Sequence, residues 1–138
     1  MAKNKETRNS NYSATITDSS REFTPKERVM FKDLGNAISM NNFAEESEAV
    51  GGKAIIETVK DFCVVSIHNE QADHTDYDVY VLIDAKGEKY YTSSEPFWNS
   101  FMDIYAEMKE CDEQWGIQLN LLPSKKYAGK KVLTCSLI

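Results

Sequence analysis

The sequence predicts a mostly β fold with helices, arranged as a small five-stranded barrel. Five runs of β-type residues follow residue 52, and a segment of helical spacing separates the third run from the fourth. A further helix signal precedes all five runs. At 138 residues and 41% hydrophobic composition, the chain has enough apolar residues for one core. We therefore expect one domain over residues 23–138, preceded by a flexible arm over residues 1–22.

The arm is predicted because residues 1–22 are almost all polar and offer too little apolar surface to offset the entropy of ordering. Thr24-Pro25-Lys26-Glu27 then predicts the start of a helix that ends near Gly35, with a capping box and a proline in the first turn. Val29, Met30 and Leu34 are expected to form its buried face. Residues 41–52 are rich in Asn, Glu, Ser and Gly, which predicts a linker or loop.

The first three strands follow. Residues 53–67 are a long run for one strand, so we expect a bend or a bulge in it. A polar loop over residues 68–76 leads to the second strand, residues 77–84. In this strand one set of side chains alternates with another, namely Tyr77, Val79, Val81 and Ile83 with Asp78, Tyr80, Leu82 and Asp84. Residues 85–88 predict a hairpin turn, and residues 89–92 are the returning third strand.

A helix and two more strands complete the pattern. Ser94 is a plausible helix cap, and apolar side chains at helical spacing follow it, namely Phe97, Phe101, Ile104, Tyr105 and Met108. Residues 117–122 are the fourth strand, and residues 132–138 are the fifth. Five strands with a helix between the third and fourth have the connectivity of the OB-fold. That fold binds oligonucleotides on strands two and three and through the loops that join strands one to two and four to five.

A basic segment, Ser124–Lys131, lies in the second of those loops. It holds four lysines around Tyr127, whereas the whole chain has a net charge of −6 and no acidic residue follows Glu113. Without these lysines the remainder stands at −10. Lysines beside an aromatic ring can hold phosphate while the ring stacks on a base, which indicates single-stranded nucleic acid. The alternative is a solvated hairpin whose lysines keep a sheet edge soluble.

The candidate binding residues are lysines for phosphate and tyrosines for stacking. The phosphate contacts are expected from Lys125, Lys126, Lys130 and Lys131, with Lys53, Lys60 and Lys89 as further candidates on the sheet. Tyr127 and Tyr80 are the expected stacking rings. One of Tyr90 and Tyr91 is expected to lie on the same outer face as Tyr80 and to stack as well, because adjacent residues in a strand point to opposite faces. The sheet tyrosines could instead be buried barrel residues. Phe97, Trp98, Phe101 and Trp115 are predicted to lie in the core.

Several function classes have little support. The sequence contains no recognisable catalytic or phosphate-loop motif, so we expect neither an enzyme nor a cofactor. The two histidines lie among aspartates at a spacing that matches no closed metal site, which favours a solvated acidic loop. Three widely separated cysteines suggest no disulfide framework. The absence of a long apolar stretch and of an apolar N-terminal segment predicts a cytoplasmic protein that does not enter a membrane.

The order of short motifs over about residues 24–138 resembles a group of small single-stranded DNA-binding proteins encoded by bacteriophages. The likeness rests on Lys26-Glu27-Arg28, on Gly87–Ser94 before an aromatic-rich helix, and on Ser124-Lys125 and Gly129-Lys130 before Leu133-Thr134-Cys135. The resemblance implies an OB-like fold and a role in protecting replicating or recombining phage DNA in the host cytoplasm. It also implies phage or host replication and recombination proteins as partners. The chain lacks the acidic C-terminal tail of bacterial single-strand binders, which puts recruitment through such a tail in doubt.

Two hypotheses follow from these observations. The first is a non-catalytic protein that coats single-stranded DNA, as a dimer or as an array along the strand. The second is an acidic phage protein that inhibits a host nucleic-acid enzyme by presenting carboxylates where DNA would bind.

Overall fold

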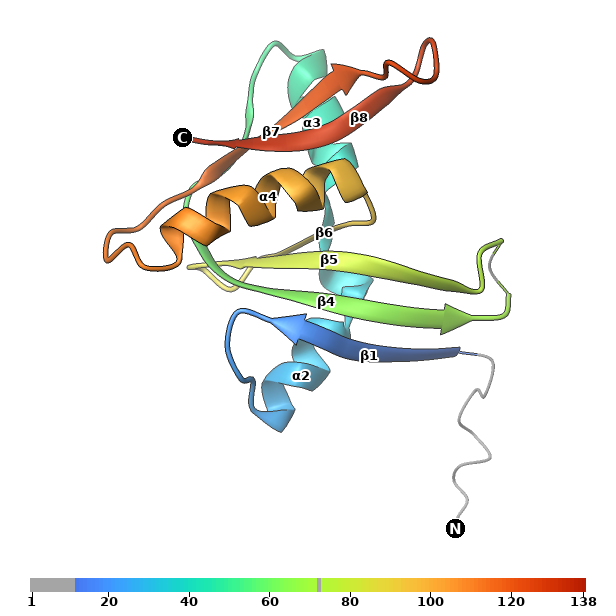
Figure 1. The fold of residues 1–138 in the computed structure, drawn as a ribbon, viewed down its shortest axis with the longest axis vertical. Helices are drawn as coiled ribbons and strands as arrows, with labels where there is room; N and C mark the ends of the chain where they lie inside the picture. The colour runs from blue at the N-terminus through green and yellow to red at the C-terminus, as the bar shows by residue number, and fades with distance from the viewer. Residues whose placement is uncertain (1–11, 72) are drawn as a thin grey trace.

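The computed structural model describes residues 12–71 and 73–138, which form two β-sheets with helices packed on them (Figure 1). The larger sheet has the strand order β1-β4-β5-β6-β2, and the smaller has the order β3-β7-β8. The strands are β1 Tyr12–Ser19, β2 Ile38–Ser39, β3 Ala54–Ile56, β4 Val59–Asn69, β5 Asp76–Asp84, β6 Lys89–Thr92, β7 Ile117–Pro123 and β8 Lys131–Leu137. The helices are α2 Pro25–Lys32, the 3₁₀ turn η1 Leu34–Asn36, α3 Met40–Ala49 and α4 Glu95–Met108.

The long first β run bends where it passes from one sheet to the other. It splits into β3 and β4, with a shift of register after Val59, which confirms the expected bend. The start of β7 lies against this bend, because the amide of Val59 donates to the carbonyl oxygen of Trp115 at 2.9 Å. A Cβ at Gly116 would collide with the backbone carbonyls of Ile56 and Glu57, so only glycine fits the approach.

The two sheets of the described chain do not close into the expected barrel. β6 pairs with the short strand β2, and β8 pairs only with β7. Helix α4 lies along the outer edge of β8 instead. There the Ser94 hydroxyl donates to the Leu133 carbonyl at 3.0 Å, and the Cys135 amide donates to the Ser100 hydroxyl at 3.1 Å. A helix that satisfies edge groups in this way protects a strand from further pairing.

The larger sheet is buried on both faces. One face packs on α4 through Phe97 and Phe101, which are fully buried as predicted, while Trp98 and Trp115 pack at the margin of this core. The other face packs on the segment around α2 through Phe23 and Phe31. Burying one such phenylalanine contributes about 1.5–3 kcal/mol, so both coverings stabilise the sheet.

The N-terminal part differs from the sequence expectation in two respects. Residues 12–19, expected to belong to the flexible arm, form β1, which pairs antiparallel with β4; residues 1–11 lie outside the described part. The capping box of α2 at Thr24 is confirmed, but the helix buries Phe31 and leaves Val29 and Met30 exposed.

Residues 41–52 were expected to form a linker, and most of them form α3 instead. The Ser39 hydroxyl caps this helix, and Met40 and Ala44 are buried against the core, which outweighs the polar composition of the segment. Among the described residues, no helix is long and apolar enough to cross a membrane.

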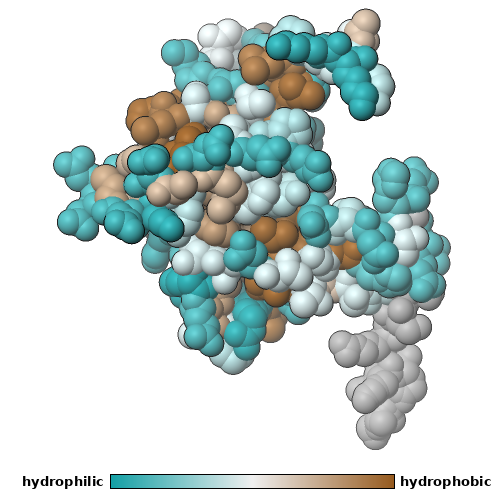
Figure 2. Space-filling model, in the orientation of Figure 1, coloured by the Kyte–Doolittle hydropathy of each residue, from teal (hydrophilic) through white to brown (hydrophobic). Residues whose placement is uncertain are grey.

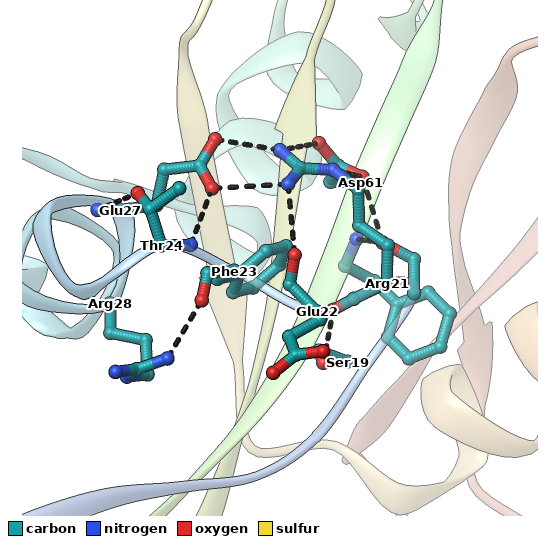
Figure 3. A network of polar contacts seen from close by, with 10 residues as sticks. Ser19, Arg21, Glu22, Phe23, Thr24, Glu27, Arg28 and Asp61 are labelled. Atoms are coloured by element: carbon teal, nitrogen blue, oxygen red, sulfur yellow. Dashed lines mark hydrogen bonds and ion pairs between the residues drawn. The ribbon is translucent and has the colours of Figure 1, made fainter.

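An arginine network fastens the segment before α2 to the larger sheet (Figure 3). Arg21 donates to both oxygens of the buried Asp61 at 3.1 Å and to both oxygens of Glu27 at 2.8 and 3.0 Å. The Ser20 hydroxyl adds a bond of 2.8 Å to Asp61. Arg21 and the Thr24 amide together lower the pKa of Glu27 to about 2. All charges of this network are therefore paired within the protein.

Candidate nucleic-acid interface

The tip of the β7–β8 hairpin, residues 124–130, has a defined backbone conformation. The Ser124 amide donates to the Lys130 carbonyl at 2.9 Å, and the Lys130 amide donates to the Tyr127 carbonyl at 3.2 Å. The Ser124 hydroxyl accepts from the amides of Lys126 and Tyr127. Gly129 adopts a φ of 79°, which favours glycine. The turn therefore holds its lysines in a fixed loop between two paired strands.

The side chains of the tip are exposed and carry one sign of charge. Lys125, Lys126 and Lys130 are exposed, and no ion pair to them is found within the described residues. Tyr127 is 60% exposed, and the Lys126 ammonium lies 5.6 Å from the centre of its ring. The tip projects from the upper right of the molecule as a hydrophilic arm (Figures 1 and 2). It thus presents three cations and one aromatic ring to solvent.

Lys131 differs from the other three lysines of the basic segment because it is paired. Its ammonium lies 2.8 Å from Glu48 of α3, and both side chains remain about half exposed. Lys53 and Glu48 line one small groove beside β7. The structure therefore brings Lys53, Lys131 and the tip to the same end of the molecule.

The outward face of the smaller sheet continues from the tip and carries polar side chains without charge. The Gln118 amide donates to Asn120 at 3.0 Å, and the Asn120 amide donates to the Ser136 hydroxyl at 3.1 Å. Sequence reasoning passed over Gln118 and Asn120 as binding candidates. Their alternation with the buried Ile117 and Leu119 is the signal that could have placed them on the outer face.

The predicted stacking rings of the larger sheet are not available to a ligand. Tyr80 does point away from the face that holds Val79 and Val81, but it is 7% exposed and stacks on Trp98 with ring centres 4.7 Å apart. Tyr90 is buried, its hydroxyl donates to Asp84 at 3.1 Å, and burial raises its pKa to about 12. Tyr91 is half-buried against the other core. Because α4 and the α2 segment cover both faces of the sheet, neither orientation leaves Tyr80, Tyr90 or Tyr91 fully exposed.

The remaining candidate lysines are scattered. The Lys89 ammonium donates to the carbonyl oxygens of Met30 and Asp33, so it caps the end of α2. Lys60 is exposed but lines a different groove, with Tyr105 and Trp115 near the end of α4. Of the residues predicted to bind together, the structure groups Lys53, Lys125, Lys126, Tyr127, Lys130 and Lys131.

The β4–β5 hairpin carries the opposite charge. His68 lies 2.8 Å from Asp76 and 3.2 Å from Glu70, and hydrogen bonds to these carboxylates raise its pKa. Asp76, Asp78 and Glu95 line an open groove of about 510 Å³ at the base of this hairpin. No set of three potential metal ligands is grouped closely enough to hold an ion in residues 12–71 and 73–138. The two hairpins thus differ in sign, and the basic hairpin is the better candidate for binding an anionic polymer.

Comparisons with protein-family models, with curated proteins and with solved structures find no match to this chain.

Proposed function

We propose that this protein binds single-stranded DNA without catalysing a reaction, and that the β7–β8 hairpin is its binding edge. One observation carries the proposal. The tip holds three exposed lysines without an ion pair in the described part and an exposed tyrosine, and residues 114–138 contain no carboxylate side chain although the whole chain is at −6.

The chemistry of the tip suits a flexible polyanion. Lys125, Lys126 and Lys130 contact phosphates without reading sequence, and Tyr127 stacks on a base that is not held in a duplex. Such a stack contributes about 1–3 kcal/mol and tolerates any base. Binding is therefore weakly sequence-dependent and strongly salt-dependent.

We also propose that the fold is an open variant of the OB-fold. The strand pairings support this interpretation. In this interpretation β3 and β4 together correspond to the first OB-fold strand, and β5, β6, β7 and β8 correspond to the second, third, fourth and fifth strands. The first strand then pairs with the second strand and with the fourth strand. The second strand also pairs with the third strand, and the fourth strand pairs with the fifth strand. The pairing of third and fifth strands that closes a barrel is replaced by α4. In this interpretation the basic tip is the loop between strands four and five, which contacts oligonucleotides in OB-folds.

The biological role that we propose is protection of single-stranded DNA during phage replication or recombination in the host cytoplasm. It rests on the resemblance of the short motifs to phage single-strand binders. Replication or recombination proteins of phage or host are the corresponding partners, and several copies could bind along one strand.

A titration of a fluorescent oligo-dT at several salt concentrations tests the binding edge. The variant K125Q/K126Q/K130Q removes three phosphate contacts, so the slope of log K against log salt should decrease by about 2 and affinity at 0.1 M salt should fall about 100-fold. K26Q/K86Q/K109Q removes the same three positive charges from exposed lysines outside the tip and serves as the matched control. Unchanged binding by the triple lysine variant would disprove the site. Equal affinity for duplex DNA would disprove stacking.

A second candidate function is an acidic protein that occupies the DNA-binding surface of a host enzyme. The observation that favours it is the open acidic groove lined by Asp76, Asp78 and Glu95, three residues that come from β5 and α4 and not from the basic hairpin. Salt-sensitive capture of one host nucleic-acid enzyme, lost in D76N/D78N/E95Q, together with no binding of oligo-dT, would favour this function over the first.

A further inference from the structure

The groove beside β7 is lined by one lysine and one carboxylate, and this carboxylate pairs with a second lysine that is distant in the sequence. Lys53 precedes β3, Lys131 begins β8, and Glu48 lies in the last turn of α3. Glu48 and Lys53 both line the groove, which has a volume of about 210 Å³, and the Lys131 ammonium lies 2.8 Å from the Glu48 carboxylate. The Lys131–Glu48 contact is the only ion pair of the basic segment within the described residues.

The lining of the groove contains no other carboxylate. It combines apolar residues of α3 and β7 with Gln118 and Asn120. β3 pairs with β7 only over residues 117–119, so the backbone of residues 120–122 has no neighbouring strand on this side. Lysine ammonium groups, side-chain amides and a strand edge are groups that bind phosphate and sugar oxygens.

The ion pair itself is weak enough to be exchanged. Its two side chains are 53% and 56% exposed, and an exposed pair of this kind gains little because water and salt screen it. A phosphate oxygen offers Lys131 the same charge-assisted contact as the Glu48 carboxylate. The two anions therefore compete for one ammonium group.

We infer that the groove of Lys53 and Lys131 is a second phosphate subsite, next to the tip, and that Glu48 is its built-in competitor. This inference rests on the proposed function for its ligand, a nucleic-acid backbone, and extends it to the phosphate that follows those held at the tip. Glu48 occupies Lys131 in the unbound protein and releases it to a phosphate. The carboxylate thereby lowers affinity for anions in general and makes binding to this groove depend on displacing it.

The test is a titration of the isotope-labelled full chain with inorganic triphosphate, followed by amide NMR signals, and in parallel with oligo-dT. E48Q should bind triphosphate two- to five-fold more tightly than the wild type, the range that corresponds to one exposed ion pair. The affected signals should include those of Lys53, Asn120 and Lys131. K131Q should bind more weakly than wild type, and E48Q/K131Q should lose the gain of E48Q.

The matched control is E46Q, which removes the same charge from the same helix at an exposed residue without this ion pair. If E46Q raises affinity as much as E48Q does, the effect is long-range charge and the inference fails. It also fails if E48Q binds triphosphate no more tightly than wild type, or if the shifted signals lie at the tip alone. Tighter triphosphate binding by E48Q with no binding of oligo-dT would leave the subsite standing and overturn the proposed function. If the protein binds oligo-dT and E48Q does not change that affinity, the proposed function stands and the inference of a second subsite fails.

Discussion

The Arg21 network and the tip of the β7–β8 hairpin both contain cationic side chains, but within the described residues only the network pairs its cation with carboxylates. Arg21 bonds two carboxylates, one of which, Asp61, has a side chain only 6% exposed. The lysines at residues 125, 126 and 130 have no such carboxylate in the described structure. A paired cation fastens one element to another, whereas an exposed cluster without a carboxylate partner is accessible to an anionic ligand. Cationic side chains thus serve stability in the Arg21 network, and in the tip they are the basis of the binding that we propose.

Asp61→Asn gives the largest expected effect on the paired side of this comparison. The change removes the charge that accepts two bonds from Arg21 and one from Ser20, so the free energy of unfolding should fall by about 2 kcal/mol. Urea unfolding measures it. K125Q/K126Q/K130Q should change stability by less than about 0.5 kcal/mol, because exposed substitutions away from such networks are close to neutral. A lysine variant as destabilised as D61N would erase the distinction between the two regions.

Tyr127→Ala tests the unpaired side. Loss of one stacked ring should weaken oligo-dT binding about ten-fold, or about 1.4 kcal/mol, without lowering the free energy of unfolding. Anisotropy titration measures the first quantity and urea unfolding the second. Tyr127→Phe is the matched control, since it keeps the ring and should bind like wild type. Equal loss in both variants would assign the role to the hydroxyl group instead.

The elements that the sequence predicted well carry local signals. The Thr24 capping box begins α2, the turn over residues 85–88 joins β5 to β6, and helical spacing marks α4. The basic tip was located by the same means, because it lies between two apolar runs. Each of these signals acts within a few residues, so no knowledge of the tertiary fold was needed.

The features that the sequence did not predict, strand β1 and the burial of the sheet tyrosines, depend on contacts between residues that are distant in the sequence. In β1, Tyr12, Ala14 and Ile16 alternate with polar residues, and the strand conformation comes from pairing with β4 about 50 residues later. The burial of Tyr80 and Tyr90 depends on distant helices, because Tyr80 stacks on Trp98 of α4 and Tyr90 on Phe43 of α3. Residues 79–83 are apolar or aromatic without a break, which is typical of strands buried on both faces and could have indicated this.

Lowering the pH should have a smaller effect, which is confined to the stability of the Arg21 network. The pKa of Glu27 is lowered to about 2 from 4.5, so its contribution to stability is complete above pH 4.5 and is lost as the pH falls through about 2. Urea unfolding should therefore show wild type more stable than Glu27→Gln at pH 7, with a gap that narrows below pH 4.5. K125Q leaves the Arg21–Glu27 pair intact, so its stability should follow that of the wild type at every acidic pH. A constant gap between wild type and Glu27→Gln down to pH 2 would show that Arg21 does not stabilise the ionised carboxyl group.

His68 gives the smallest effect and extends the comparison to the acidic hairpin. Its hydrogen bonds to Asp76 and Glu70 raise its pKa above 6.5, so the contribution to stability is present below pH 6.5 and disappears as the pH rises through the raised value. NMR titration of the imidazole should show that Asp76→Asn moves the pKa back toward 6.5, because Asp76 makes the shorter contact. Asp73→Asn, an exposed neighbour outside this cluster, should leave the pKa unchanged. Neither variant should weaken oligo-dT binding, since the histidine is a paired cation like Arg21 and lies on the hairpin of opposite charge. If Asp76→Asn did weaken oligo-dT binding, a cation paired within the protein would also affect binding, and the distinction between paired and unpaired cations would fail.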